Sequence, residues 1–479
     1  MSEKNMTNIV YFVFKSINQA YLYDANTNNV VSISDDAYIY LSSVRTGNDL
    51  GCDSNVLGEI AQLKSRGYLL ERAIKEIRHP VSDNIEIYTG RMISMVCLQL
   101  THACNLRCTY CTYTQNNGTQ RLHANRSMHV DIAKQAVDFY HAHSIDSARA
   151  HVSFYGGEPL QEIDLMREIV AYAKKRFSGK QLSFGMTTNG TLLKGETLDF
   201  VAQNKMQVIV SIDGPKEITN ANRIFANTGL GVHDTVMANL EYIEKHYPEF
   251  FNTLSINSVI DPLHDFDEYM DFFETGIISE MNKNGGIYED ITLTQKVKPE
   301  EKYMSKITYH KFIGLLHMLG RYPGVYKKHL ASMEIYDNAR KTEPFDVIRK
   351  IPDSTYGHPS GPCVPGVFRS FVDVDGNIYP CERISETSEN TKIGHVYHGL
   401  NMDSAMAMLN IGKLTAKQCL DCWAFTLCSA CIKYALDSDG ALSKEVRLSR
   451  CRRIRRDAYN NLRLHALKLE MPTYSTGGA

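Results

Sequence analysis

Cys104, Cys108 and Cys111 lie within one stretch of eight residues, directly after a short apolar segment. Three thiolates on one loop can hold three corners of a cubane iron–sulfur cluster, which leaves the fourth iron without a protein ligand. An open metal position is how proteins let a metal bind a substrate. A structural zinc knuckle is the alternative, with His102 as its nearest fourth ligand. Because soft thiolates dominate this loop, we favour iron–sulfur chemistry.

A second group of seven cysteines lies toward the C-terminus: Cys363, Cys381, Cys419, Cys422, Cys428, Cys431 and Cys451. Asp375-Gly376 is a hairpin signal between the short segments 371–374 and 377–379, and this hairpin would bring Cys363 and Cys381 together. A pair of zinc sites is the alternative. The five residues between Cys422 and Cys428 are few for a zinc ribbon, and an odd number of thiols fits two tetrahedral sites poorly.

Composition limits the other function classes. The chain has 479 residues, 43% of them apolar, which is enough for two or three domains with their own cores. A net charge of −2 creates no global attraction to nucleic acid or anionic membrane. No secretory signal or membrane-length apolar run is evident, so we expect a cytosolic protein. Cysteines stay reduced there, and clustered ones indicate metal or catalysis; Cys52 and Cys97 are interpreted as small buried hydrophobes.

The first cysteine group must be positioned by a region in which strands and amphipathic helices alternate, from about residue 91 to residue 297. Six strands are expected: Met95–Leu100, His151–Tyr155, Leu182–Thr187, Val208–Ile212, Leu254–Ile260 and Ile291–Leu293. Amphipathic helices such as Val130–His143 and Leu165–Lys175 separate them. This alternation predicts an α/β fold, a partial (β/α)6 TIM-like barrel, whose ligands bind at the carboxyl ends of the strands.

A compact region precedes the barrel. It contains three expected strands, Val10–Phe14, Ala20–Tyr23 and Val30–Ile33. Ser34 is a predicted N-cap for the helix that follows. A second helix ends at Gly67, before an expected short strand at Tyr68–Leu70. Strands followed by helices and a strand indicate a winged-helix-like module.

The spacing of the first cysteine group, together with segments after the later strands, resembles the radical S-adenosylmethionine (SAM) superfamily. In that family the open iron binds the amino and carboxylate groups of SAM, and the reduced cluster cleaves SAM to a 5′-deoxyadenosyl radical. The resemblance implies that Tyr110 lies beside the adenine. It further implies SAM contacts from Gly156, Gly157 and Glu158 after the second strand, Asn189 after the third, Ser211 and Asp213 after the fourth, and Arg223.

The second cysteine group resembles the SPASM domain, which holds two auxiliary [4Fe–4S] clusters in peptide-modifying radical SAM enzymes. This implies three [4Fe–4S] clusters in all. By resemblance, the outer auxiliary cluster is held by Cys419, Cys422, Cys428 and Cys451. The same resemblance implies that Cys363, Cys381 and Cys431 hold the inner one. It then has only three cysteine ligands, because residues 364–380 contain no further cysteine. Its fourth ligand is then either Asp373 or Asp375, or a substrate thiolate, which such iron prefers.

Six arginines crowd the last cysteine: Arg447, Arg450, Arg452, Arg453, Arg455 and Arg456. Cations close to an anionic cluster would raise its reduction potential. A solvated basic helix face is an equally good interpretation. Nucleic-acid binding is disfavoured, because the run lacks interleaved aromatic residues.

The N-terminal module resembles the peptide recognition element of peptide maturases, in which a leader peptide adds a strand to an exposed sheet edge. Packing of an accessory domain on the barrel is the alternative. The expected organisation is therefore a winged-helix-like leader-binding element over residues 1–85, a radical SAM barrel over 91–297, a helical bridge over 298–350 and a SPASM domain over 351–460.

The resulting hypothesis is an enzyme that installs thioether crosslinks between cysteine sulfur and carbon in a ribosomally made precursor peptide. The partners implied are that peptide and an external electron donor such as flavodoxin or ferredoxin. No residue is assigned as a general acid or base. Carbon–carbon crosslinking, sulfatase-type peptidyl oxidation, an iron–sulfur electron carrier or scaffold, and a zinc-based binding module are the alternatives.

Overall fold

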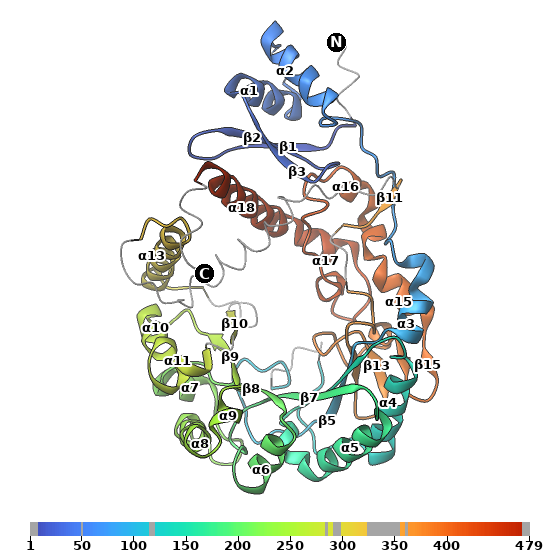
Figure 1. The fold of residues 1–479 in the computed structure, drawn as a ribbon, viewed down its shortest axis with the longest axis vertical. Coiled ribbons are helices and arrows are strands. Elements are labelled where there is room, and N and C mark those ends of the chain that lie inside the picture. Colours follow the sequence, from blue (N-terminus) through green and yellow to red (C-terminus); the bar gives the residue numbers. More distant parts are fainter. Residues whose placement is uncertain are drawn as a thin grey trace.

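The fold is that of a computed structural model, and its elements form a ring in which the N-terminal module and the barrel lie at opposite ends (Figure 1). The cysteine-rich C-terminal region connects these two ends along one side. The structure describes residues 8–48, 51–114, 120–282, 286–290, 298–322, 355–359 and 363–471. No helix in these ranges is both long and apolar enough to cross a membrane.

The N-terminal module is a three-stranded antiparallel sheet with two helices. Its elements are β1 (Tyr11–Lys15), β2 (Ala20–Asp24), β3 (Asn29–Ile33), α1 (Asp35–Arg45) and α2 (Ser54–Ser65). Ser34 caps α1 as expected, because its hydroxyl accepts a hydrogen bond from the N–H of Ala37 at 3.1 Å. Buried Leu22, Leu41 and Ile60 join the sheet and both helices in one core.

The expected strand at Tyr68–Leu70 is wrong. Leu69 has a φ of 51°, in the left-handed region that an extended strand excludes. Its side chain is fully buried and its N–H donates to Asp24 Oδ2 at 2.9 Å, so packing and this bond hold the unusual conformation. Only an isolated bridge between Ile9 and Glu71 follows.

Within the described residues the barrel contains six parallel strands, and the first five lie within two residues of their predicted bounds. They are β5 (Met95–Thr101), β6 (Arg149–Gly156), β7 (Gln181–Thr188), β8 (Gln207–Ser211), β9 (Ser255–Ile260) and β10 (Gly286–Asp290). They are adjacent in sequence order. The expected strand Ile291–Leu293 lies outside the described residues, and β10 takes the sixth place directly before it.

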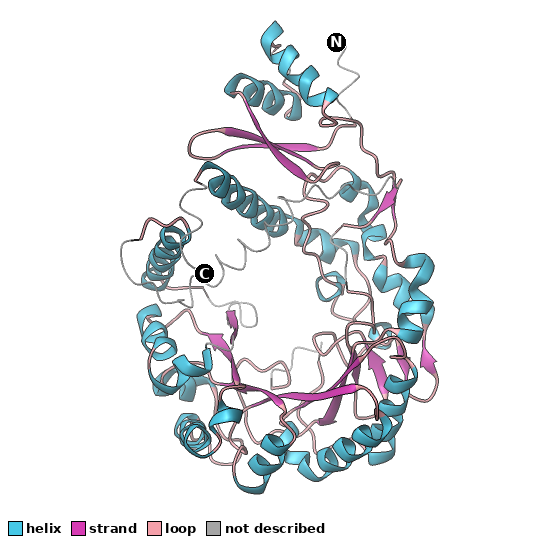
Figure 2. Ribbon diagram, viewed as in Figure 1, coloured by secondary structure: helices cyan, strands magenta, loops and turns pink. Residues whose placement is uncertain are grey.

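Helices separate the barrel strands and cover the outer face of the curved sheet (Figure 2). They are α4 (Val130–Ala142), α5 (Ile163–Arg176), α6 (Gly195–Gln203), α7 (Lys216–Asn222), α8 (His233–His246), α9 (Pro248–Phe251), α10 (Phe266–Glu274) and α11 (Gly276–Asn282). This crossover pattern is what parallel strands require. Of the expected bridge, the structure describes α13 (Glu301–Met318), and residues 323–350 lie outside the described ranges.

The C-terminal region extends the barrel sheet. β12 (Ser370–Val372) runs parallel to β5, with Phe371 opposite Cys97. It turns back into β13 (Asn377–Tyr379) through the predicted Asp375-Gly376 turn, where Gly376 has a φ of 90°. β14 (Gly394–His395) and β15 (Gly399–Leu400) complete a ten-stranded sheet. The C-terminal hairpin is therefore joined to the first barrel strand by backbone hydrogen bonds.

The remaining elements are short ones before the barrel and around the hairpin, followed by a long final helix. They are α3 (Ile85–Arg91), β4 (Glu76–Ile77), β11 (Tyr356–Gly357), α15 (Met402–Leu409), α16 (Ala416–Leu420), α17 (Lys444–Ser449) and α18 (Cys451–Glu470). α18 continues past residue 460, the expected end of the domain, and packs under the N-terminal sheet through Ala458, Leu462 and Ala466 (Figure 1). The N-terminal module and the cysteine-rich region thus share one hydrophobic core.

Candidate functional site

The first cysteine group lies on the loop after β5, and its three thiols are neighbours. Burial raises the pKa of Cys104 to about 12, and the nearby thiols of Cys108 and Cys111 add to that shift. Burial also raises the pKa of Cys108 to about 11, although the Arg223 guanidinium opposes it. Buried thiols this close together resist ionisation, because each thiolate would repel the next. A bound metal removes that penalty by stabilising the thiolates, so this donor set fits an iron–sulfur cluster.

Two glycines let the loop after β6 lie directly against the cysteine loop. A Cβ atom on Gly157 would stand 2.0 Å from the carbonyl oxygen of Ala103, and one on Gly156 would stand 2.4 Å from that of Thr101. The N–H of Gly157 donates to Thr101 O, and the N–H of Glu158 donates to Ala103 O, both at 2.9 Å. The glycines were predicted to allow close approach to a ligand; the backbone that they approach in this structure is that of the cysteine loop.

Glu158 is buried and joins three strand ends. Its Oε1 accepts hydrogen bonds from Thr188 Oγ1 at 2.7 Å and from the N–H of Leu160 at 3.1 Å. Its Oε2 accepts from the N–H of Asn189 at 2.8 Å. Burial raises the pKa of this carboxyl, and these three bonds oppose the rise. A carboxylate has about four acceptor positions, so capacity for one more donor remains.

Asn189 connects the ends of β7 and β5 through a side-chain network that the sequence did not predict. Its Nδ2 donates to Asn105 Oδ1 at 2.8 Å and lies 4.0 Å from the sulfur of Cys104. Its Oδ1 accepts from the hydroxyl of Thr191 at 2.6 Å, and Asn105 Nδ2 returns to that hydroxyl at 2.8 Å. Asn105 stands between two predicted ligands, and that position was the one available signal.

Tyr110, Asp213 and Arg223 form a buried triad at the end of β8. The Tyr110 hydroxyl donates to Asp213 Oδ2 at 2.5 Å. Arg223 binds the same carboxylate through Nε at 2.9 Å and Nη2 at 3.0 Å. The fourth residue expected here, Ser211, is also buried, and its hydroxyl makes no hydrogen bond within the described residues. Of the eight predicted SAM-contact residues, six lie at the carboxyl ends of β6 to β8 or directly after them. Tyr110, from the cysteine loop, and Arg223, from the end of α7, reach the same edge through Asp213.

Among the C-terminal cysteines, the structure brings two sets of thiols together. Cys419, Cys422 and Cys428 lie close enough for each thiolate to disfavour the next. Cys381 and Cys431 interact in the same way. Cys451 begins α18 and donates to Arg447 O at 3.9 Å, and Cys363 is exposed. Within the described ranges, no three His, Cys, Asp or Glu side chains are arranged to hold a single metal ion.

The two aspartates weighed as a fourth inner ligand are already engaged. Asp373 Oδ1 accepts from the N–H groups of Asp375 and Asn377, at 3.0 and 2.8 Å. Asp373 Oδ2 accepts from Asn377 Nδ2 at 2.8 Å. Asp375 accepts from Arg126 Nη2 at 2.6 Å. These carboxylates therefore stabilise the turn and its contact with the barrel.

A buried contact that the sequence did not reveal joins the cysteine loop to the region after Cys381. Glu386 accepts from Tyr113 at 2.7 Å, Arg121 at 3.0 Å and Gln99 at 2.6 Å. His102, the candidate zinc ligand, is bonded instead to Gln99 Oε1 through Nε2 at 3.0 Å. Charged residues in two separate loops give no periodic signal, which is why this contact could not be predicted.

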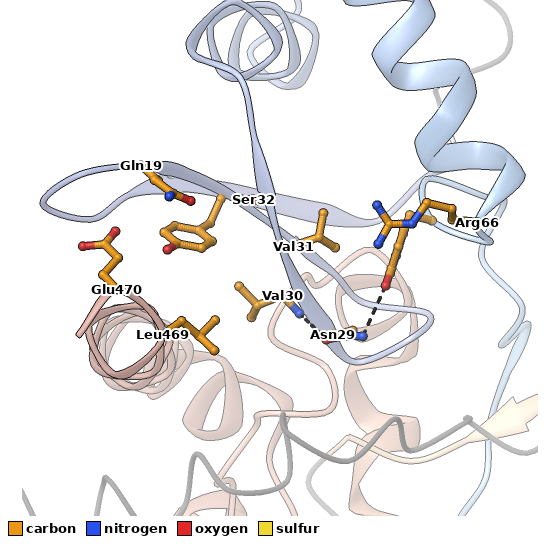
Figure 3. Close-up of a pocket in the computed structure, with 10 residues that line it drawn as sticks. Gln19, Asn29, Val30, Val31, Ser32, Arg66, Leu469 and Glu470 are labelled. Carbon is orange, nitrogen blue, oxygen red and sulfur yellow. Dashed lines mark hydrogen bonds between the residues drawn. The ribbon is translucent and has the colours of Figure 1, made fainter. Parts of the chain in front are cut away.

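A cavity of about 420 Å³ opens beside β3, the edge strand of the N-terminal sheet (Figure 3). Residues of β2 and β3 form one wall, and Leu469 and Glu470 at the end of α18 form the opposite one. Arg66 and Tyr68 line it beside α2, where the Tyr68 hydroxyl accepts from Asn29 Nδ2 at 3.3 Å. An unpaired strand edge beside a cavity is the geometry that β-augmentation requires.

Comparisons with known proteins agree with this geometry. The radical SAM superfamily pattern matches residues 98–274, which span β5 to α10. An uncharacterized protein of Methanocaldococcus jannaschii is 30% identical over 235 residues, covering 49% of this chain and 73% of that protein. The cysteine-type anaerobic sulfatase-maturating enzyme of Clostridium novyi is 24% identical over 317 residues, covering 64% and 77% of the two chains.

Solved structures share the fold. The structure of native anSMEcpe with bound AdoMet has a TM-score of 0.55 and 20% identity, covering 78% of this chain and 99% of that one. The same protein with AdoMet and the Cp18Cys peptide gives 0.52 and 18%, covering 78% and 99%. With the cysteine loop, the Gly156–Glu158 loop and the strand-end network on one edge of the barrel, the chain belongs to the radical SAM superfamily.

Proposed function

We propose that this radical SAM enzyme installs thioether crosslinks between cysteine sulfur and carbon in a precursor peptide. The observation that carries the proposal is the inner cysteine group. It offers the thiols of Cys363, Cys381 and Cys431, while the aspartates of the adjacent hairpin are committed to other bonds. An inner cluster held by three cysteines has a position that a substrate thiolate would fill, since thiolate is the ligand such iron prefers.

The cofactor assignments follow from the donor sets. Cys104, Cys108 and Cys111 would hold the SAM-binding cluster, and Cys419, Cys422, Cys428 and Cys451 the outer auxiliary cluster. SAM on its reduced cluster supplies a 5′-deoxyadenosyl radical that removes a hydrogen atom, and an auxiliary cluster accepts an electron. Within the chain, Glu158 has one acceptor position left for the SAM ammonium, and Ser211 has a hydroxyl available for the ribose.

The atom balance defines the expected product. One hydrogen atom leaves the acceptor carbon, one proton leaves the cysteine thiol, and one electron passes to the clusters. The acceptor carbon and the cysteine sulfur then join in the new carbon–sulfur bond. Each crosslink therefore lowers the peptide mass by two hydrogens and removes one alkylatable thiol.

The N-terminal module would supply substrate recognition. A leader segment would pair with the unpaired edge of β3 and place side chains in the cavity beside it. Arg66 and Glu470 line that cavity with opposite charges, which favours a segment carrying both signs. The remaining expectations, a cytosolic setting and a flavodoxin- or ferredoxin-type reductant, belong to this proposal.

The test is anaerobic co-expression of the chain with a short cysteine-containing peptide encoded beside it. Intact peptide mass is measured before and after thiol alkylation. Loss of two hydrogens with a matching loss of alkylatable cysteine supports the thioether. The same mass loss with every cysteine still alkylatable contradicts it and indicates carbon–carbon linkage. Failure to release 5′-deoxyadenosine under reductant would instead support an electron carrier or scaffold.

Oxidation of a peptidyl cysteine is the second candidate, because the chain is similar to cysteine-type anaerobic sulfatase-maturating enzymes. That reaction leaves an aldehyde, which a hydrazide reagent would label, whereas a thioether is inert to it. For both readouts the test variant is Cys381→Ser, which removes a predicted inner ligand, and the matched control is Cys52→Ser. Cys52→Ser leaves every predicted ligand in place and should leave the product unchanged.

A further inference from the structure

Arg72 connects the N-terminal module to the outer cysteine group. Its backbone N–H donates to Asn8 O at 2.9 Å, which fixes it at the base of the module. Its side chain is only 5% exposed, and the guanidinium carbon lies 4.5 Å from the ring centroid of Phe425. Phe425 belongs to the loop between Cys422 and Cys428. A cation from the N-terminal part of the chain is thus buried against the loop that carries two predicted ligands of the outer cluster, Cys422 and Cys428.

Most donors of this guanidinium have no acceptor. Nη1 donates to Ala25 O at 3.4 Å, but Nε and Nη2 have no hydrogen-bond partner in the part of the chain that the structure describes. Asp24, Asp421 and the Cys422 thiolate attract the charge without accepting a bond from these two nitrogens. An arginine remains charged even when buried. Two buried N–H groups without an acceptor call for an acceptor beside them, which an anionic group bound there would supply.

A second arginine, Arg447, is also buried near these cysteines and also has an unpartnered donor. Arg447 is 3% exposed, and its Nε donates to Thr415 Oγ1 at 3.0 Å. That hydroxyl lies 3.2 Å from Cys419 Sγ, and the guanidinium attracts the Cys428 thiolate. Its Nη1 has no partner within the described residues. Two arginines from distant segments thus combine unsatisfied guanidinium donors with electrostatic attraction to thiols of the same group.

Among the other arginines around Cys451, Arg455 also faces the outer group: burial raises the pKa of the Cys422 thiol, and Arg455 opposes that rise through its charge and a hydrogen bond. Three others are directed elsewhere. Arg450 lies over the ring of Tyr434 at 4.8 Å, and Arg453 and Arg456 pair with Asp457 at 3.9 and 3.5 Å. The run identified in the sequence therefore contains both alternatives at once, a buried Arg447 beside the cysteines and a solvated face. Arg72 was not suspected, because it lies far from the cysteines in the sequence.

We propose that Arg72 is a positioning residue for the outer auxiliary cluster, donating Nε–H and Nη2–H to its sulfur atoms and, with Arg447, raising its reduction potential. The inference rests on the proposed function, because it requires a cluster held by Cys419, Cys422, Cys428 and Cys451. Reduction adds negative charge, so a nearby cation and hydrogen bonds to sulfur stabilise the reduced form. The recognition module thereby supplies part of the electrostatic setting of an electron-accepting centre.

The test compares full-length Arg72→Met and Arg72→Lys with the unchanged chain, each reconstituted anaerobically. Iron and sulfide contents are measured first, and the midpoint potential of the outer cluster is then followed by EPR during a redox titration. Arg72→Met should disfavour reduction at least tenfold, a shift of about 59 mV to more negative potential for a one-electron couple. Arg72→Lys keeps the charge and should shift less. Arg456→Met, an equal loss of charge on an exposed side chain nearby, should leave the midpoint unchanged.

Full iron content with an unshifted midpoint in Arg72→Met overturns the inference. If that variant does not assemble its clusters, Arg72→Lys decides, and a midpoint equal to that of the unchanged chain overturns the inference. A separate variant, Cys422→Ser, distinguishes failure of the underlying assignment. If its iron content and EPR spectrum match those of the unchanged chain, no outer cluster is held by this group, and the proposed cluster assignment fails with the inference.

Discussion

The ring of Phe12 in β1 stacks on the ring of Trp423, with centroids 4.1 Å apart and planes inclined by 14°. Trp423 directly follows Cys422, so the first strand of the chain packs on the loop that carries the outer cysteine group. Tyr459 of α18 meets the same Phe12 ring edge-on at 5.7 Å. The N-terminal module is thereby held to the cysteine-rich region by aromatic packing.

Phe12→Ala should weaken this contact. Removing a half-buried phenylalanine and its aromatic pairing is expected to lower the free energy of unfolding by about 2 kcal/mol. Trp423 is the sole tryptophan, so its fluorescence during urea titration reports on this interface directly. Ile17→Ala, at a side chain that is 67% exposed, is the matched control. An unchanged Trp423 transition in Phe12→Ala would contradict the role of the stack.

Gly157→Ala should disrupt the site although it leaves every predicted cluster cysteine in place. The added Cβ would stand 2.0 Å from a backbone oxygen of the cysteine loop, which has no flexible end to move aside. We expect SAM affinity to fall at least tenfold, about 1.4 kcal/mol, as measured by equilibrium dialysis on reconstituted protein. Gly58→Ala, where a Cβ meets nothing within 4 Å, should bind SAM normally. Equal affinities for the two variants would refute the tight-contact argument.

Asp213→Asn should leave the buried Arg223 without a counter-charge. Breaking a buried, bidentate ion pair on one side typically costs about 3–5 kcal/mol of stability, measurable by chemical denaturation. The double variant Asp213→Asn/Arg223→Met should recover part of that loss, since the uncompensated charge is then gone. Asp146→Asn, at an exposed pair with Arg91, should change stability little. A double variant as unstable as the single one would show that the charge imbalance is not the cause.

His358 is expected to account for part of the loss of stability in acid. Burial lowers its pKa from 6.5 to about 3, and its Nε2 accepts the N–H of Gly412 at 2.8 Å, which only an unprotonated nitrogen can do. The folded state thus binds fewer protons than the unfolded state. This contribution to stability is present in full above pH 6.5 and declines as the pH falls toward 3, by up to about 1.4 kcal/mol per unit.

His358→Gln should therefore flatten the decline in stability between pH 6.5 and pH 4, as followed by thermal unfolding across that range. Gln can still accept from Gly412, so the bond itself is preserved. The exposed His129→Gln serves as the comparison. If both variants lose stability with acid as steeply as the unchanged chain, His358 is not a source of the effect.

Local patterns were sufficient for most elements. Alternating or continuous apolar runs predicted β5 to β9 closely, and Ser34 was recognised as a cap because hydroxyls favour that position. Relations between distant segments could not be predicted. The pairing of β12 with β5 joins Phe371 to Cys97 across the sequence, and no local pattern encodes it. The strand predicted at Tyr68–Leu70 was wrong for a different reason, since tertiary packing at Leu69 overrides the backbone preference of leucine.

The site shows the same division. Spacing alone identified the ten cysteines in two groups, and family resemblance placed residues such as Glu158 and Arg223 near the first group. The supporting shell was not predicted: Asn105, Glu386 and Arg72 act through contacts with loops far away in the sequence. Single polar residues in loops carry no periodicity, so their roles depend on the folded arrangement.

α18 fixes the distance between the outer cysteine group and the N-terminal cavity. It begins at Cys451 and ends at Glu470 in the wall of the N-terminal cavity. Its 20 residues span about 30 Å of rigid helix. A peptide anchored in that cavity would need about nine extended residues to cover the same length. The helix would then set, by its number of turns, the smallest spacing between an anchored segment and one that reaches the outer cysteine group.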